Sequence, residues 1–218
     1  MDLKNFELDQ LLLENVTLSD RGRDPILQNV DFQIPLDQTV VVESSHPTNA
    51  LQFLKLLAGT QACTGGRVLW NGFDVFSEDL EINVHHVVGA YFEGQVYFKP
   101  GTVESFLKSF LSDSQFEDVN LHFDLMPYLK NDLSKMNYGF QKLIKLVQIV
   151  SQAPQLLVLE DPAQGLTESQ WLNWLDYVQF QQRRTQFHEQ HFHRCQIHEP
   201  SLPRCFRQIL YELFLHQH

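Results

Sequence analysis

The stretch "VVVESSHPTNALQFLKLLAG", residues Val40–Gly59, constrains the fold more than any other part of the sequence. Val40–Val42 is a run of β-branched apolar residues, which is typical of a strand buried in a parallel sheet. The leucine spacing that follows predicts a helix over Ala50–Ala58, and Gly59 stands where a helix stop is expected. A strand, a loop and a helix in this order indicate a parallel α/β unit.

The loop of this unit has the position of a phosphate-binding loop but lacks its residues. A working loop of this kind follows the pattern G-x-x-x-x-G-K-[ST] between its strand and its helix. The sequence instead reads "ESSHPTNAL" there, with no glycine and no lysine. It also carries Pro47, and proline has no backbone N–H to direct at an anion. The frame of the site is therefore present without its chemistry.

The rest of the chain alternates between strand and helix patterns. Strand patterns cover Leu11–Leu18, Pro25–Pro35, Thr64–Val75, Val84–Gly94 and Gln155–Pro162. Asn71-Gly72 inside the third of these predicts a β-hairpin. Helical spacing covers Val103–Val150 and Glu168–Phe180. Because we find no internal repeat and no low-complexity linker, we expect a single domain over residues 1–218.

Charge and composition exclude several classes of protein. The formal net charge is −11, which argues against a nucleic-acid partner, since neutralising phosphates needs clustered Lys and Arg. No apolar run approaches the ~20 residues that cross a bilayer. The first ten residues lack a signal-peptide pattern, and three widely spaced cysteines do not suggest a disulfide framework, so we expect a cytoplasmic protein.

A His-rich segment invites a metal hypothesis. It contains His188, His191, His193, Cys195 and His198. No second cluster completes a ligand set of the usual zinc spacing. We therefore expect no metal site.

Two longer segments, taken in order, resemble a known family. They are "LLAGTQACTGGRVLWNGFDV" and "MNYGFQKLIKLVQIVSQAPQLLVLEDPAQGL". Together they resemble the nucleotide-binding domain of the ATP-binding cassette (ABC) family, the motor subunits of membrane transporters, over roughly Leu11–Leu213. The resemblance implies an α/β, P-loop NTPase-like fold. That fold has a mainly parallel core sheet, an antiparallel β subdomain from the N-terminal third, and a helical subdomain near residues 99–150.

The resemblance also assigns positions to the nucleotide site, and most of them are changed. Ser44 and Asn49 stand at the two glycines of the phosphate loop. Ala50 stands at the phosphate-binding lysine, and Leu51 at the magnesium-binding Ser/Thr. Two lost contacts to a charged ligand, each worth about 1.5–3 kcal/mol, imply affinity weaker by roughly 10²–10⁴-fold. We expect no cofactor here, with magnesium ATP bound very weakly or not at all.

The other motifs depart in the same direction. Glu93 replaces the glutamine that senses magnesium. The L-S-G-G-Q signature, which reaches the partner's nucleotide across a dimer, best matches Met136–Phe140, where Asn137, Tyr138 and Gly139 hold the central positions. A rival match at Leu133-Ser134 lies three residues too early.

The acids after the last apolar strand pattern are reversed. The family has Asp then Glu, whereas this chain has Glu160 then Asp161. A misplacement of ~1 Å at such groups can cost 10²-fold in rate. The family's switch histidine stays open between His198, which has the similar local context, and His191 or His193, which have the better spacing.

These expectations combine into one functional hypothesis. We expect a catalytically degenerate, pseudo-ATPase cassette with a structural or regulatory role beside a transmembrane permease. A second, active cassette is the expected partner, and a heterodimer is favoured over a homodimer because a homodimer would have no motor. The protein would lie on the inner face of the membrane through these partners. We expect the permease contact at "YFEGQVYFKPGTV", whose aromatic residues we expect to lie in an exposed loop. The alternatives are an ATP-hydrolysing subunit with a rebuilt site, and a soluble cassette-derived scaffold.

Overall fold

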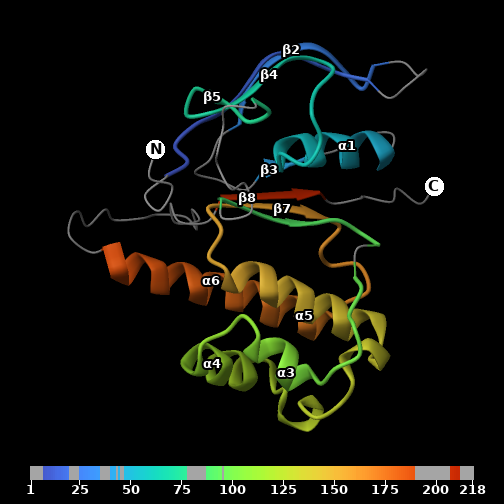
Figure 1. The fold of residues 1–218 in the computed structure, drawn as a ribbon, viewed down its shortest axis with the longest axis vertical. Coiled ribbons are helices and arrows are strands. Elements are labelled where there is room, and N and C mark those ends of the chain that lie inside the picture. The colour runs from blue at the N-terminus through green and yellow to red at the C-terminus, as the bar shows by residue number, and fades with distance from the viewer. Residues whose placement is uncertain are drawn as a thin grey trace. The chain divides into compact units, whose positions relative to one another are not determined.

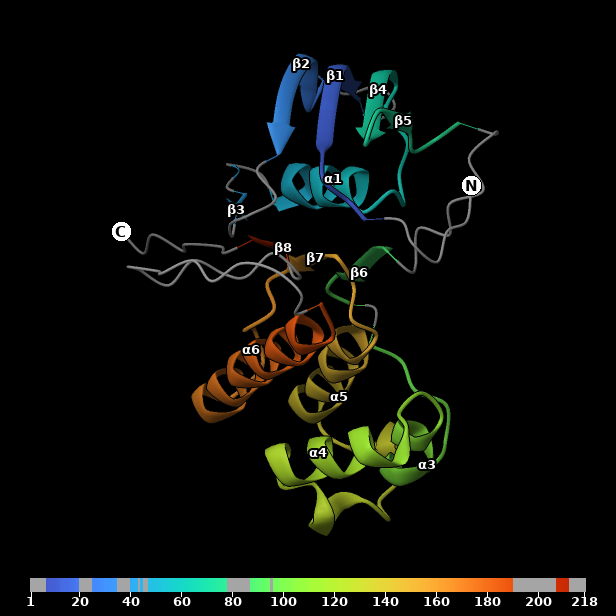
Figure 2. The same cartoon turned by 90° about the vertical axis from the view of Figure 1, so that its left-hand side faces the viewer.

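The computed structural model describes residues 7–19, 25–34, 40–42, 44, 47–77, 87–94, 96–189 and 207–211. For residues 41, 47, 182–189 and 207–211 it describes the backbone alone. The chain forms two compact units, whose elements Figures 1 and 2 show. Unit 1 comprises Met1–Phe92, Pro154–Asp161 and Arg194–His218, and unit 2 comprises Glu93–Ala153 and Pro162–His193.

Unit 1 contains an antiparallel sheet with the strand order β2–β1–β4–β5. Its strands are β1 (Leu11–Leu18), β2 (Leu27–Ile34), β4 (Gly65–Trp70) and β5 (Phe73–Asp74). Leu11, Leu13, Val16 and Leu18 of β1 are fully buried, so one face of the strand enters the core. Asn71 and Gly72 both have positive φ, 49° and 83°, which is the geometry of a tight hairpin turn. The hairpin predicted from Asn71-Gly72 is confirmed.

Unit 1 also contains a parallel sheet with the order β3–β8–β7–β6. Its strands are β3 (Val40–Val41), β6 (Val88–Tyr91), β7 (Leu156–Glu160) and β8 (Arg207–Tyr211). All neighbouring strands run parallel, and Leu156–Leu159 of β7 are 0% exposed. A continuous apolar strand of this kind is what a sheet covered on both faces requires. The sequence patterns predicted three of these strands and missed β8.

Helix α1 (Pro47–Leu57) follows the short strand β3 and packs into the core of unit 1. Leu54 and Leu57 are 0% exposed, and Gly59 takes a positive φ of 68° just after the helix. The helix begins three residues before the predicted start at Ala50. Proline suits the first position of a helix, because the N–H that it lacks has no partner inside the helix there.

Unit 2 is helical, and Figure 2 shows its helices. Its elements are α3 (Val103–Lys108), α4 (Asp113–Phe123), the 3-10 turns η2 (Met126–Tyr128) and η3 (Leu133–Lys135), α5 (Tyr138–Ser151) and α6 (Glu168–Glu189). Polar side chains cap the starts of three helices: Thr102 for α3, Ser112 for α4 and Asn137 for α5. Within the described part of the chain, no helix is long and apolar enough to cross a membrane.

Candidate functional site

The phosphate-loop positions of unit 1 take part in packing. Ala50 is 1% exposed and belongs to the core cluster of unit 1, and Leu51 packs against the same cluster. Ser44 and Asn49 are half-buried. The side chains that stand where the resemblance implies a cation and a hydroxyl are therefore apolar groups that contribute to the core.

The two acids stand at the carboxyl end of β7. Glu160 is the last residue of β7 and lies beside Tyr211 of β8 in the ladder. Asp161 has a φ of 44°, in the left-handed region. Among non-glycine residues, aspartate accepts this region several-fold more often than average, so the backbone favours Asp at the second position.

Glu93 accepts hydrogen bonds from two side chains of α5. The Tyr138 hydroxyl donates to Glu93 Oε2, and the Lys142 Nζ donates to Glu93 Oε1. Lys142 is 0% exposed on its side chain and Glu93 is 23% exposed, so this is a largely buried ion pair. Lys142 Nζ also donates to the backbone carbonyl oxygen of Gln164, at 2.7 Å. We call Glu93, Tyr138, Lys142 and the Gln164 carbonyl the Glu93 cluster.

The signature positions lie at the N-terminus of α5. Asn137 is the N-cap residue, and its side chain accepts from the backbone N–H of Phe140 at 2.9 Å. Gly139 lies against a turn of the chain: a Cβ added to it would come within 2.3 Å of the Gly165 carbonyl oxygen. On the other side of this contact, a Cβ on Gly165 would lie 3.1 Å from Tyr138 Cδ1. Gly139 thus has a packing role inside unit 2.

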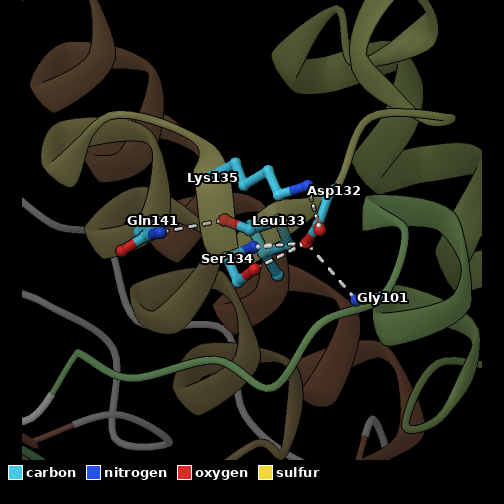
Figure 3. A network of polar contacts seen from close by, with 6 residues as sticks. All are labelled: Gly101, Asp132, Leu133, Ser134, Lys135 and Gln141. Atoms are coloured by element: carbon cyan, nitrogen blue, oxygen red, sulfur yellow. Dashed lines mark hydrogen bonds and ion pairs between the residues drawn. The ribbon is translucent and has the colours of Figure 1, made fainter.

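The rival signature match, Leu133-Ser134, lies in a polar connection that Figure 3 shows. The Asp132 carboxylate accepts from the Ser134 backbone N–H at 3.1 Å and from the Ser134 hydroxyl at 2.7 Å. These bonds, that of the hydroxyl above all, lower the pKa of Asp132. The Leu133 carbonyl accepts from Gln141 Nε2 at 2.9 Å, and the Leu133 side chain is buried. The Ser134 hydroxyl therefore stabilises the turn before α5 through its hydrogen bond to Asp132.

Three of the four aromatic residues in the predicted permease segment are buried, which corrects the expectation that they are exposed. Tyr91 is 1% exposed, Phe92 4% and Phe98 7%, whereas Tyr97 is 81% exposed. Phe98 also makes an edge-to-face contact with Phe106 of α3 at 4.8 Å between ring centroids. Large rings gain most free energy by leaving water, so a run of aromatics is a poor guide to a free surface. Of these four aromatic residues, only Tyr97 is exposed as predicted.

The switch-histidine candidates His191, His193 and His198 lie outside the described residues, as does Cys195 of the His-rich segment. All three histidines precede β8 in the chain. Among the residues that the structure describes, no group of three or more His, Cys, Asp or Glu could hold a metal ion.

Sequence analysis missed Lys142, Gln164 and Gly165. A signal for Lys142 exists: it follows Tyr138 by four residues on α5, so both side chains lie on the same face. A lysine inside the apolar run "FQKLIKLV" at that spacing needs a buried partner. The sequence gives no sign of which partner, because Glu93 lies 49 residues away.

The sequence is similar to those of two ATP-binding proteins of transporters. The chain is 24% identical over 162 residues to the energy-coupling factor transporter ATP-binding protein EcfA1 of Halalkalibacterium halodurans, covering 69% of this chain and 58% of that protein. It is 22% identical over 171 residues to the zinc import ATP-binding protein ZnuC of Mannheimia succiniciproducens, covering 76% and 60%. The chain thus spans about three fifths of the length of these two relatives. No family model matches the sequence.

A solved structure extends the comparison to the fold. The ATP binding subunit of an ABC transporter matches with a TM-score of 0.69 and 15% identity, over 94% of this chain and 80% of that one. The chain therefore has the ABC ATPase-like, P-loop NTPase fold, and the predicted fold class is confirmed. Its curated and structural neighbours point to the ATP-binding domain of an ABC transporter.

Proposed function

We propose that the chain is a cassette subunit of a membrane transporter complex that has lost ATP hydrolysis and acts in a structural or regulatory role. The observation that supports this most is the packing of Ala50 and Leu51 in unit 1. A triphosphate bound in water-excluded surroundings needs compensating positive charge. Positions 50 and 51 supply neither a cation nor a magnesium ligand, so binding of magnesium ATP is lost or very weak.

The same proposal includes partners. A cassette without hydrolysis contributes through its fold and surface, so it needs a transmembrane permease and gains from an active second cassette in a heterodimer. The chain then lies on the cytoplasmic face of the membrane through these subunits. Tyr97, 81% exposed, is the aromatic residue of the predicted permease segment that is available for this contact. Amphipathic rings of this kind are enriched among interface residues that carry binding energy.

Affinity purification from detergent-solubilised membranes tests this function. We expect the tagged chain to bring down an integral membrane protein equally well with magnesium ATP and with EDTA, because attachment does not depend on nucleotide. Tyr97→Ala should reduce the recovered partner by about tenfold, which corresponds to ~1.4 kcal/mol. Leu121→Ala is the matched control, since Leu121 of α4 is 85% exposed and its loss should leave recovery unchanged. Recovery of no membrane protein would support a soluble scaffold and contradict the proposal.

A further inference from the structure

Lys142 connects three segments of unit 2 that are far apart in the chain. Its ammonium group comes from α5, and it binds Glu93, 49 residues earlier, and the carbonyl of Gln164, 22 residues later. The side chain is 0% exposed. A buried ammonium keeps its charge only where acceptors replace its water shell. The two segments must therefore stay close to α5 for Lys142 to remain in place.

Two further contacts close the same region. The Tyr138 hydroxyl binds the second carboxylate oxygen of Glu93, so Glu93 is held at both oxygens. Gly139 leaves no room for a Cβ against the Gly165 carbonyl oxygen, which means that the turn at Gln164 and Gly165 lies directly on the first turn of α5. A carboxylate held at both oxygens loses most of its rotational freedom, and a backbone-to-backbone contact leaves no gap for a ligand.

We propose that the Glu93 cluster is a latch. Lys142 is its positioning residue, and it holds two segments on the N-terminus of α5, the one that contains Glu93 and the turn at Gln164–Gly165. No ligand is needed for this. We infer the latch itself from the contacts of Lys142, independently of the proposed function. The role that we give to the latch, which is to make these segments independent of ATP, rests on the proposed function. Glu93 and Asn137–Gly139 occupy positions to which the resemblance assigns nucleotide-dependent contacts, and in this chain an internal cation organises them instead. The cassette would then keep one arrangement of these segments whether or not ATP is present.

Hydrogen–deuterium exchange on the full-length protein tests the latch. The readout is the exchange rate of backbone amides in residues 93–98 and 163–166, with and without magnesium ATP. In the unchanged protein we expect slow exchange in both segments and no effect of nucleotide. Lys142→Met replaces the ammonium with an apolar side chain of similar length, and it should raise exchange in both segments by roughly tenfold or more. Lys145→Met is the matched control, because Lys145 lies on the same helix and binds Gln148 instead.

A second variant covers the case in which Lys142→Met does not fold. Tyr138→Phe removes one hydroxyl from a residue that is 42% exposed, so the fold should persist. It should speed exchange in residues 93–98 and leave residues 163–166 unchanged, because the Lys142–Gln164 contact remains. Unchanged exchange in residues 93–98 of Tyr138→Phe, or unchanged exchange in both segments of folded Lys142→Met, would overturn the latch.

The two proposals fail in different ways in this experiment. Protection of residues 44–51 by magnesium ATP, together with the expected effect of Lys142→Met, would contradict the proposed function and leave the latch standing. Absence of any nucleotide effect, together with unchanged exchange in folded Lys142→Met, would contradict the latch and leave the proposed function standing.

Discussion

Replacing Glu93 with alanine is expected to lower the free energy of unfolding by about 3–5 kcal/mol, the range found when one partner of a buried ion pair is removed. The substitution takes the carboxylate away from Lys142, whose side chain is 0% exposed, and from the Tyr138 hydroxyl. Urea denaturation followed by circular dichroism measures the effect. Glu104→Ala is the matched control, because Glu104 pairs with Lys108 on the surface at 2.6 Å, and exposed pairs of this kind contribute little.

The second half of this prediction is a rescue. Removing both charges in Glu93→Ala with Lys142→Met eliminates the buried ammonium that no longer binds Glu93, and buried ion pairs are often replaced by apolar side chains at little cost. We expect the double variant to be more stable than Glu93→Ala, with a coupling free energy of about 2 kcal/mol. Simple addition of the two single effects would contradict a buried, energetically coupled pair.

Gly139→Ala is expected to destabilise the protein, although alanine is the better helix former. In the first turn of α5 the helical preference alone would favour alanine by about 0.5–1 kcal/mol. The added Cβ would come within 2.3 Å of the Gly165 carbonyl oxygen, however, so the backbone must move. Overpacking of this kind costs about 1–3 kcal/mol.

The measurement is again the free energy of unfolding, with no nucleotide present. Gly101→Ala is the control, because a Cβ at Gly101 would meet only the Ser105 hydroxyl oxygen at 3.5 Å, an ordinary contact. If Gly139→Ala is as stable as the unchanged protein or more stable, Gly139 does not pack against Gly165. Its match to the signature would then need another explanation.

Local patterns predicted most of the fold. The Asn71-Gly72 turn, the strand pattern of Leu11–Leu18 and the apolar run of Leu156–Leu159 can each be recognised from a few neighbouring residues. Strand β8 could not be found in this way, because only three consecutive residues of its sequence, Arg207-Gln208-Ile209-Leu210-Tyr211, are apolar. It is a strand through pairing with β3 on one side and β7 on the other, and such pairing depends on residues distant in the chain.

The candidate site was only partly predictable for the same reason. Glu93 and Tyr138 each stood out alone as departures from the family pattern, but their hydrogen bond joins residues 45 positions apart. Lys142 was missed because a lysine in an amphipathic helix is ordinarily solvated. The aromatic residues Phe92 and Phe98 were expected at an exposed partner contact, but they are buried. Hydrophobicity alone does not distinguish a core residue from a residue that binds a partner.

Isothermal titration of the purified full-length chain with magnesium ATP tests the loss of the nucleotide site most directly. We expect no saturable heat up to about 1 mM nucleotide, which corresponds to a binding free energy weaker than about −4 kcal/mol. The same titration of Glu160→Gln identifies a rebuilt site, because binding through that carboxylate would disappear in the variant. Magnesium-dependent binding in the micromolar range would contradict the loss of the nucleotide site.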